Sequence, residues 1–169
     1  QAVEVGPGAD QRVSATGADL GTVFGLQAPN KRRFGDFRAA VAAHLFGQFT
    51  LAGLAETVRL AETRGESVQS VEADVSSAED VARYVEAAEA HYGGVDVLFN
   101  NAGIEGAVAP IEDYPEAVFD KVVAVNIKGV YLGMKSVVDA MRRRGGGAIV
   151  NAASGAGLRG TPTLLAYGA

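Results

Sequence analysis

From residue 54 onward, the chain alternates between two kinds of segment, and this alternation constrains the fold more than any other feature. Short apolar runs of strand length are followed by longer stretches with helical periodicity, and the joints between them are short and rich in glycine, serine or aspartate. Such an order is typical of an α/β domain whose parallel sheet is covered by helices. We therefore predict a doubly wound parallel sheet, which is incomplete because residues 1–53 do not show the pattern.

Apolar periodicity predicts the individual elements of this region. Helices are expected over residues 54–64, from Ser76-Ser77-Ala78-Glu79 to Gly93-Gly94, and from Pro115 to Arg142-Arg143-Arg144; strands are expected over residues 68–75, 95–99 and 148–152. Residues 76–79 have the form of a capping box, in which a serine hydroxyl and the glutamate side chain bind free backbone amides at a helix start. In the first third, residues 39–46 are compatible with a helix.

The charge balance argues against nucleic acid as a partner. The chain has 15 Lys and Arg residues against 20 Asp and Glu, a net charge of -5, whereas phosphate binding needs clustered cations. The arginine cluster at 142–144 lies where a helix is expected to end, and cations there complement the helix dipole. Hydrophobic residues make up 48% of the chain, which is enough to build a core.

The absence of cysteine removes disulfides, thiolate catalysis and cysteine-ligated metal from consideration, and makes the cytoplasm the default location. The two histidines, His44 and His91, are far apart in the sequence, so no metal site is expected. No run approaches the roughly 20 apolar residues that a membrane-spanning helix needs, so no membrane partner is expected either.

Polar and small residues follow two of the predicted strands. Asn100-Asn101-Ala102-Gly103 comes directly after the strand at 95–99, and Ser154 follows the strand at 148–152. Alanine and glycine let a backbone approach a flat ligand, and asparagine amides can bind strand ends and a ribose, although an ordinary asparagine-rich turn has the same sequence. In open α/β sheets, ligands bind at the carboxyl ends of the strands.

Asn126 lies in the middle of the long predicted helix. Asparagine is unfavourable inside a helix, so either the side chain faces solvent or its amide is used. Little polar surface surrounds it, because its neighbours are the apolar residues Val122, Val123, Val125 and Ile127. This favours the interpretation that the Asn126 amide is used.

Together with Tyr167, which follows Ser154 by thirteen positions and precedes Gly168-Ala169, these motifs resemble the short-chain dehydrogenase/reductase family. The resemblance implies a Rossmann-like fold, NAD or NADP as cofactor, and hydride transfer between the nicotinamide and a secondary alcohol or carbonyl. It implies that Tyr167 is the acid/base, that Ser154 holds the substrate oxygen, and that Asn126 anchors a water of the proton relay. A small-molecule substrate and a homo-oligomer of the complete protein are further expectations.

The resemblance also implies a set of cofactor-binding residues. The asparagine-rich motif is expected beside the adenosine half, Asp74 is expected to accept a hydrogen bond from the adenine amine, and Val75 is expected to lie along the adenine ring. The full implied set is Asp74, Val75, Asn100, Asn101, Ala102, Gly103 and Tyr167.

Two features depart from the family pattern. The family has a lysine four positions after its tyrosine, which is two positions past Ala169, and this lysine stabilises the phenolate and holds the nicotinamide ribose. The nearest candidate for the family's glycine-rich fingerprint is residues 16–23, where Val23 takes the place of the third glycine. We therefore expect an atypical segment over residues 1–53, a Rossmann-like core over residues 54–169, and truncation at the C-terminus.

Two alternatives to the enzyme stay open. One is a non-catalytic remnant, or an oligomerisation module that pairs through the helix containing Asn126. The other is that residues 1–52 are an unrelated or frame-shifted stretch joined to a dehydrogenase fragment, which the change of composition near residue 52 suggests.

Overall fold

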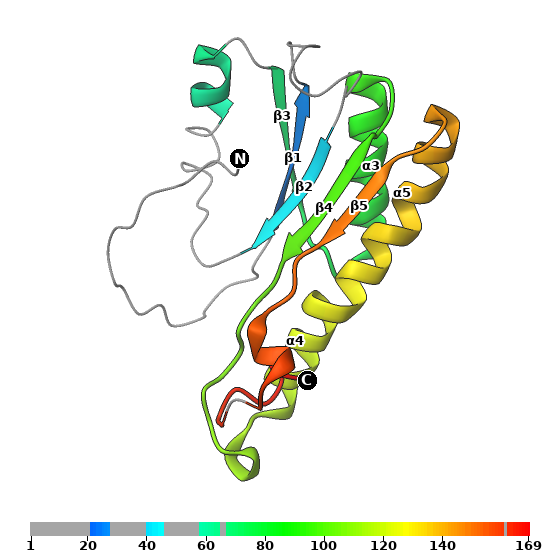
Figure 1. Cartoon of the computed structure of the whole chain (residues 1–169). Helices are drawn as coiled ribbons and strands as arrows, with labels where there is room; N and C mark the ends of the chain where they lie inside the picture. Colours follow the sequence, from blue (N-terminus) through cyan, green and yellow to red (C-terminus); the bar gives the residue numbers. More distant parts are fainter. Residues whose placement is uncertain (1–20, 28–39, 46–57, 65–66, 161) are drawn as a thin grey trace.

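The computed structural model describes residues 21–27, 40–45, 58–64, 67–160 and 162–169. Its centre is a five-stranded sheet with the order β3-β1-β2-β4-β5 (Figure 1). The strands are β1 (Gly21–Gln27), β2 (Ala40–Leu45), β3 (Ser67–Ala73), β4 (Val97–Ala102) and β5 (Ala148–Asn151). The first two strands come from the segment expected to be atypical, and they pair into the same sheet as the other three.

Strand direction departs from the prediction at one strand. β2, β4 and β5 pair in parallel, whereas β1 runs antiparallel to both of its neighbours, β2 and β3. It follows that β3 points the same way as β2, β4 and β5. The predicted α/β sheet is confirmed, and every described strand except β1 has the predicted common direction.

The helix considered for residues 39–46 is wrong, because strand β2 occupies residues 40–45, the described part of this stretch. Periodicity cannot separate a strand from a helix over such a short apolar run, and pairing with β1 on one side and β4 on the other favours the strand. Residues 21–23, the end of the candidate glycine-rich fingerprint, belong to β1 rather than to a loop. Residues 16–20 lie outside the described part of the chain.

Helices α3 (Ala78–Tyr92) and α5 (Val130–Arg144) cover one face of the sheet (Figure 1). α3 contacts β3 and β1, and α5 contacts β4 and α3. The long predicted helix is confirmed as one continuous path, in which α4 (Glu116–Val123) passes through the π-helical segment η2 (Ala124–Gly129) into α5. Short 3-10 turns follow β4 and β5, at η1 (Ile111–Asp113) and η3 (Gly155–Leu158), and residues 58–63 form a further helix.

The core lies between the sheet and these two helices. In β4, Leu98 and Asn100 are buried while Phe99 is 37% exposed, which is the alternation expected of a strand with one covered face. α3 contributes Val81 and Tyr84 to the core, and burial raises the pKa of Tyr84 to about 12. No helix in the described ranges is long and apolar enough to cross a membrane.

The start of α3 lies one residue later than the predicted capping box. Ser77 is the N-cap, and its hydroxyl accepts a hydrogen bond from the Asp80 backbone N–H at 3.3 Å. The residue whose N–H the cap binds is therefore Asp80 rather than Glu79. At the other end, Gly93 caps the helix with φ 75°, a left-handed conformation that glycine adopts without strain.

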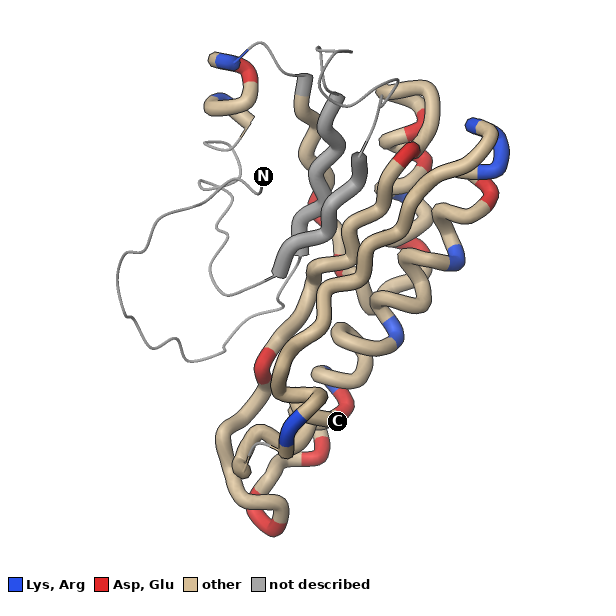
Figure 2. Tube along the Cα trace, in the orientation of Figure 1, with Lys and Arg blue, Asp and Glu red and all other residues tan. Residues whose placement is uncertain are grey.

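Arg144 holds the end of α5 against the connection between α3 and β4. Its guanidinium donates to both carboxylate oxygens of Asp96, at 3.2 and 3.1 Å, and to the Gly93 carbonyl at 3.2 Å. The arginine cluster lies at the end of the molecule where β5 begins (Figure 2). Arg143 is also paired, with Glu89 of α3 at 2.7 Å, and the cluster lies in the last turn of α5, as predicted.

The close approach of α5 to β4 depends on Gly133. The Asn100 side chain lies where a side chain at this position would be, and a Cβ on Gly133 would overlap the Asn100 Oδ1 atom. The glycine thus makes room for a buried amide between the helix and the sheet.

Replacing Gly133 with alanine is expected to lower the free energy of unfolding by about 1–3 kcal/mol, because an extra methyl group in a packed core forces its neighbours to move. Urea unfolding followed by circular dichroism measures the change. Gly155→Ala is the control, since a Cβ at that position meets nothing within 4 Å. If both variants were as stable as the wild-type chain, the close approach of Gly133 to Asn100 would be wrong.

Candidate functional site

The predicted site residues gather at one edge of the sheet. Because β3, β4 and β5 point the same way, their carboxyl ends share an edge, toward the lower end of the strands in Figure 1. Asp74 follows β3 directly, Asn101 and Ala102 end β4, and Ser154 comes three residues after β5. This is the edge where ligands bind in open α/β sheets.

Asn100 uses its side chain to join three elements. It is 5% exposed, and its Nδ2 donates to the Asn151 Oδ1 of β5 at 2.9 Å and to the Val130 carbonyl of α5 at 3.4 Å. Its backbone carbonyl accepts from the Ala152 N–H at 2.8 Å. Asn100 therefore binds strand ends, one of the two uses expected for an asparagine here, and it fixes the spacing of β4 and β5 just before the edge.

The rest of the asparagine-rich motif lies where the chain leaves β4 at the edge of the sheet. Asn101 and Ala102 are the last residues of β4, Gly103 is the first residue beyond it, and all three are half-buried. Neither Ala102 nor Gly103 carries a bulky side chain that would keep a flat ligand from the backbone.

Asn126 fixes the loop that follows. Its Oδ1 accepts from the Ile104 N–H and its Nδ2 donates to the Ile104 carbonyl, both at 2.9 Å. Both polar atoms of the amide are thus used, and they clamp the backbone directly after Gly103. Asn126 lies within the π-helical segment η2, a kind of distortion that frequently marks functional sites. Periodicity alone does not reveal this segment.

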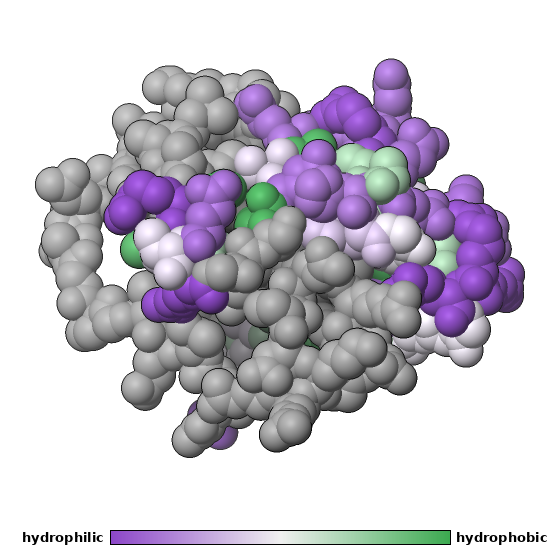
Figure 3. Space-filling view, turned by 90° about the horizontal axis from the view of Figure 1, so that it is seen from above, coloured by the Kyte–Doolittle hydropathy of each residue, from purple (hydrophilic) through white to green (hydrophobic). Residues whose placement is uncertain are grey.

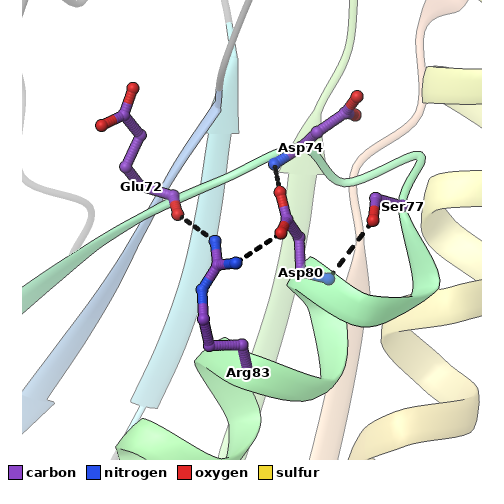
Figure 4. Close-up of polar contacts among 5 residues, drawn as sticks. All are labelled: Glu72, Asp74, Ser77, Asp80 and Arg83. Carbon is purple, nitrogen blue, oxygen red and sulfur yellow. Dashed lines mark hydrogen bonds and ion pairs between the residues drawn. The ribbon is translucent and has the colours of Figure 1, made fainter.

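Asp74 is held by a network that sequence reasoning did not find (Figure 4). Its Oδ1 accepts from the backbone N–H and the hydroxyl of Ser76, at 2.8 and 2.7 Å. Its backbone N–H donates to Asp80 Oδ2 at 2.7 Å. The Arg83 guanidinium donates to Asp80 Oδ1 at 2.5 Å and to the Glu72 carbonyl at 2.6 Å. The Asp74 N–H and the Arg83 guanidinium hold the pKa of Asp80 below its usual value.

Val75 is 3% exposed, and its side chain lies against Gly129 at the end of η2, where a Cβ on the glycine would be 3.1 Å from Val75 Cγ2. The side chain therefore belongs to the core.

Ser154 and Tyr167 lie on two segments that pack together. Ser154 is half-buried, and its Oγ accepts from the Ala156 N–H at 3.2 Å at the start of η3. Tyr167 is half-buried in the last turn of the chain, where a Cβ on Gly168 would be 3.5 Å from the Ala156 carbonyl oxygen. The turn is also joined to the loop after β4, because the Ala109 N–H donates to the Thr163 carbonyl at 3.0 Å.

The loops at this edge expose apolar side chains. Val108 and Ile111 follow β4 and Leu158 follows β5, and they are 67%, 71% and 89% exposed. At the opposite end, the described residues in view are mainly hydrophilic (Figure 3). The carboxyl edge thus combines apolar surface with polar groups, the composition expected of a small-molecule site.

Known proteins are similar to this chain in sequence and in fold. The family model for short chain dehydrogenases matches residues 38–169. Levodione reductase from Leifsonia aquatica is 46% identical over 97 residues, which are 57% of this chain and 36% of that protein. The crystal structure of an NAD+-bound xylitol dehydrogenase has a TM-score of 0.67 and 37% identity, and the match covers 70% of this chain and 46% of that one. A structure of ElxO with NADP bound has a TM-score of 0.53 and 36% identity, over 56% of this chain and 38% of that one.

The chain spans between 36% and 51% of the length of curated relatives such as levodione reductase and 3beta-hydroxysteroid dehydrogenase 1 from Eggerthella lenta. The family model covers well over half of the chain, including β2 and every described element after it. The fold, the shared edge of β3, β4 and β5, and this match lead to one conclusion: the chain belongs to the short-chain dehydrogenase family.

Proposed function

We propose that this chain provides the adenosine-binding edge and the proton-transfer residues of an NAD- or NADP-dependent oxidoreductase acting on a secondary alcohol or carbonyl. The observation that carries the proposal is the shared carboxyl edge of β3, β4 and β5, which brings together Asp74, the end of β4 and Ser154. The NAD+ and NADP in the names of the similar structures support the choice of cofactor.

The residues at the edge fit the adenosine half of a dinucleotide. Asp74 offers a carboxylate to the adenine amine, and Ala102 and Gly103 themselves carry no bulky side chain. When bound, the nicotinamide supplies the hydride donor or acceptor.

The protein's own residues would handle the substrate oxygen. Ser154 holds this oxygen by a hydrogen bond, and Tyr167 passes a proton to it or takes one from it. In Asn126, each polar atom bonded to Ile104 keeps capacity for one more hydrogen bond. We assign that remaining capacity to a water of the proton relay.

A titration of the 169-residue chain with NADH and NADPH, followed by nicotinamide fluorescence, tests the proposal. We expect saturable binding of at least one of the two. Asp74→Asn should weaken it by up to about tenfold, because the acceptor loses the negative charge that strengthens its hydrogen bond to the adenine amine. Asp139→Asn removes an exposed carboxylate on α5 and serves as the matched control. Absence of binding at millimolar cofactor, or equal binding by Asp74→Asn and the wild-type chain, would contradict the proposal.

The outer face of the long helix supports a second copy of the chain as a partner. Ile127 and Tyr131 are one helical turn apart, and they are 55% and 54% exposed. Phe119 in α4 is 37% exposed. Large apolar side chains gathered on one helix are typical of an interface, and we propose that this helix forms the homo-oligomer contact.

Ile127→Glu is expected to shift the protein toward the monomer, because association would bury the new carboxylate. Size-exclusion chromatography with light scattering measures the mass relative to the 17.4 kDa chain. Leu60→Glu places the same charge on another exposed helical position, 43% exposed, and should leave the mass unchanged. A wild-type chain that stays monomeric at all concentrations would contradict the proposed contact.

A further inference from the structure

The polar network at the start of α3 reaches beyond the helix that it caps (Figure 4). In a capping box, the acidic side chain binds the backbone N–H of the N-cap residue. Here the N-cap is Ser77, but the Asp80 carboxylate binds the N–H of Asp74, three residues before the cap. Asp80 therefore fixes the end of β3 rather than only the first turn of the helix.

Arg83 extends the network to the other side of Asp74. One of its terminal nitrogens donates to Asp80 Oδ1, and the other donates to the backbone carbonyl of Glu72. The two side chains thus hold the Glu72 carbonyl and the Asp74 N–H together. The Asp74 carbonyl accepts from the Ser77 N–H at 3.0 Å, which closes the turn.

We propose that Asp80 and Arg83 are positioning residues that set the affinity for the adenosine half of the cofactor by holding the backbone on both sides of Asp74. The inference rests on the proposed function, because it takes Asp74 as the contact of the adenine amine. Neither side chain needs to touch the cofactor. They act through the direction in which the Asp74 carboxylate points.

A role in stability alone does not account for this geometry. The Arg83–Asp80 pair has the i,i+3 spacing of an ordinary helix-surface pair, and the Arg83 side chain is 51% exposed. Exposed pairs of this kind typically contribute little to stability. The chain contains a matched pair, Asp139–Arg142, with the same spacing at 3.1 Å and with both side chains about three-quarters exposed. Both residues of this second pair lie on α5, far in the sequence from Asp74.

The test compares Asp80→Ala, Arg83→Ala and Arg83→Lys with Asp139→Ala and Arg142→Ala in the full 169-residue chain. Isothermal titration with ADP-ribose and with NADH gives the dissociation constants, and thermal unfolding gives the midpoint of each variant. We expect both alanine variants at the Asp74 turn to bind ADP-ribose and NADH about five- to tenfold more weakly, by the same factor for both ligands, because the nicotinamide is not involved. The loss should persist when binding is measured well below the midpoint of each variant, where all variants are folded, and Arg83→Lys should recover part of the affinity.

Three results would overturn the inference. Unchanged affinity in both alanine variants would show that the pair does not position Asp74. A loss of binding that is explained entirely by a smaller folded fraction would show that the role of the pair is stability. A loss for NADH without a loss for ADP-ribose would place the effect at the nicotinamide end. Failure of the wild-type chain to bind NADH would instead overturn the proposed function itself, and the inference with it.

Discussion

The buried amide of Asn100 is the constraint on which the rest of the site depends. A buried polar group needs hydrogen-bond partners, and leaving one unmade costs about 1–3 kcal/mol. Asn100 finds its partners in Asn151 of β5 and in the Val130 carbonyl of α5, and Gly133 leaves space for it. One side chain thereby fixes β4 relative to β5 and to the helix behind them. The residues that follow β4 and β5 are therefore also held at this spacing.

The π-helical segment η2 connects the two halves of the candidate site. Gly129 packs against Val75, in the turn after β3, and Asn126 clamps Ile104, in the loop after β4. These two contacts come from residues only three positions apart on one helix. The turn that carries Asp74 is further held by Asp80 and Arg83. The site is thus built by fixing backbone segments, so that the few reactive side chains have defined positions.

The sequence could predict much of the fold and part of the site. Short apolar or alternating runs predicted the strands β3, β4 and β5, and helical periodicity predicted the helices from α3 onward. Ser76 and Ser77 are both good N-caps, so the sequence does not decide which of them starts α3, and in the structure it is Ser77. The side chains of Asn126 and Asp80 bond to residues outside the helix in which each lies. The apolar periodicity of one segment therefore does not predict these bonds. Strand β2 and the reversed β1 depend on pairing partners, which a short apolar run does not specify.

If the cofactor lies across the carboxyl ends of β3, β4 and β5, its addition must change the surroundings of the residues there. Amide chemical shifts of the isotope-labelled chain, recorded with and without NADH, measure this. We expect shifts for the amides of Asp74, Gly103 and Ser154 and their neighbours. We expect unchanged amide shifts at Gly93 and Gly145, the C-caps of α3 and α5, which lie away from the carboxyl ends of the strands. Shifts concentrated at Gly93 and Gly145, with none at the three strand ends, would contradict this placement of the cofactor.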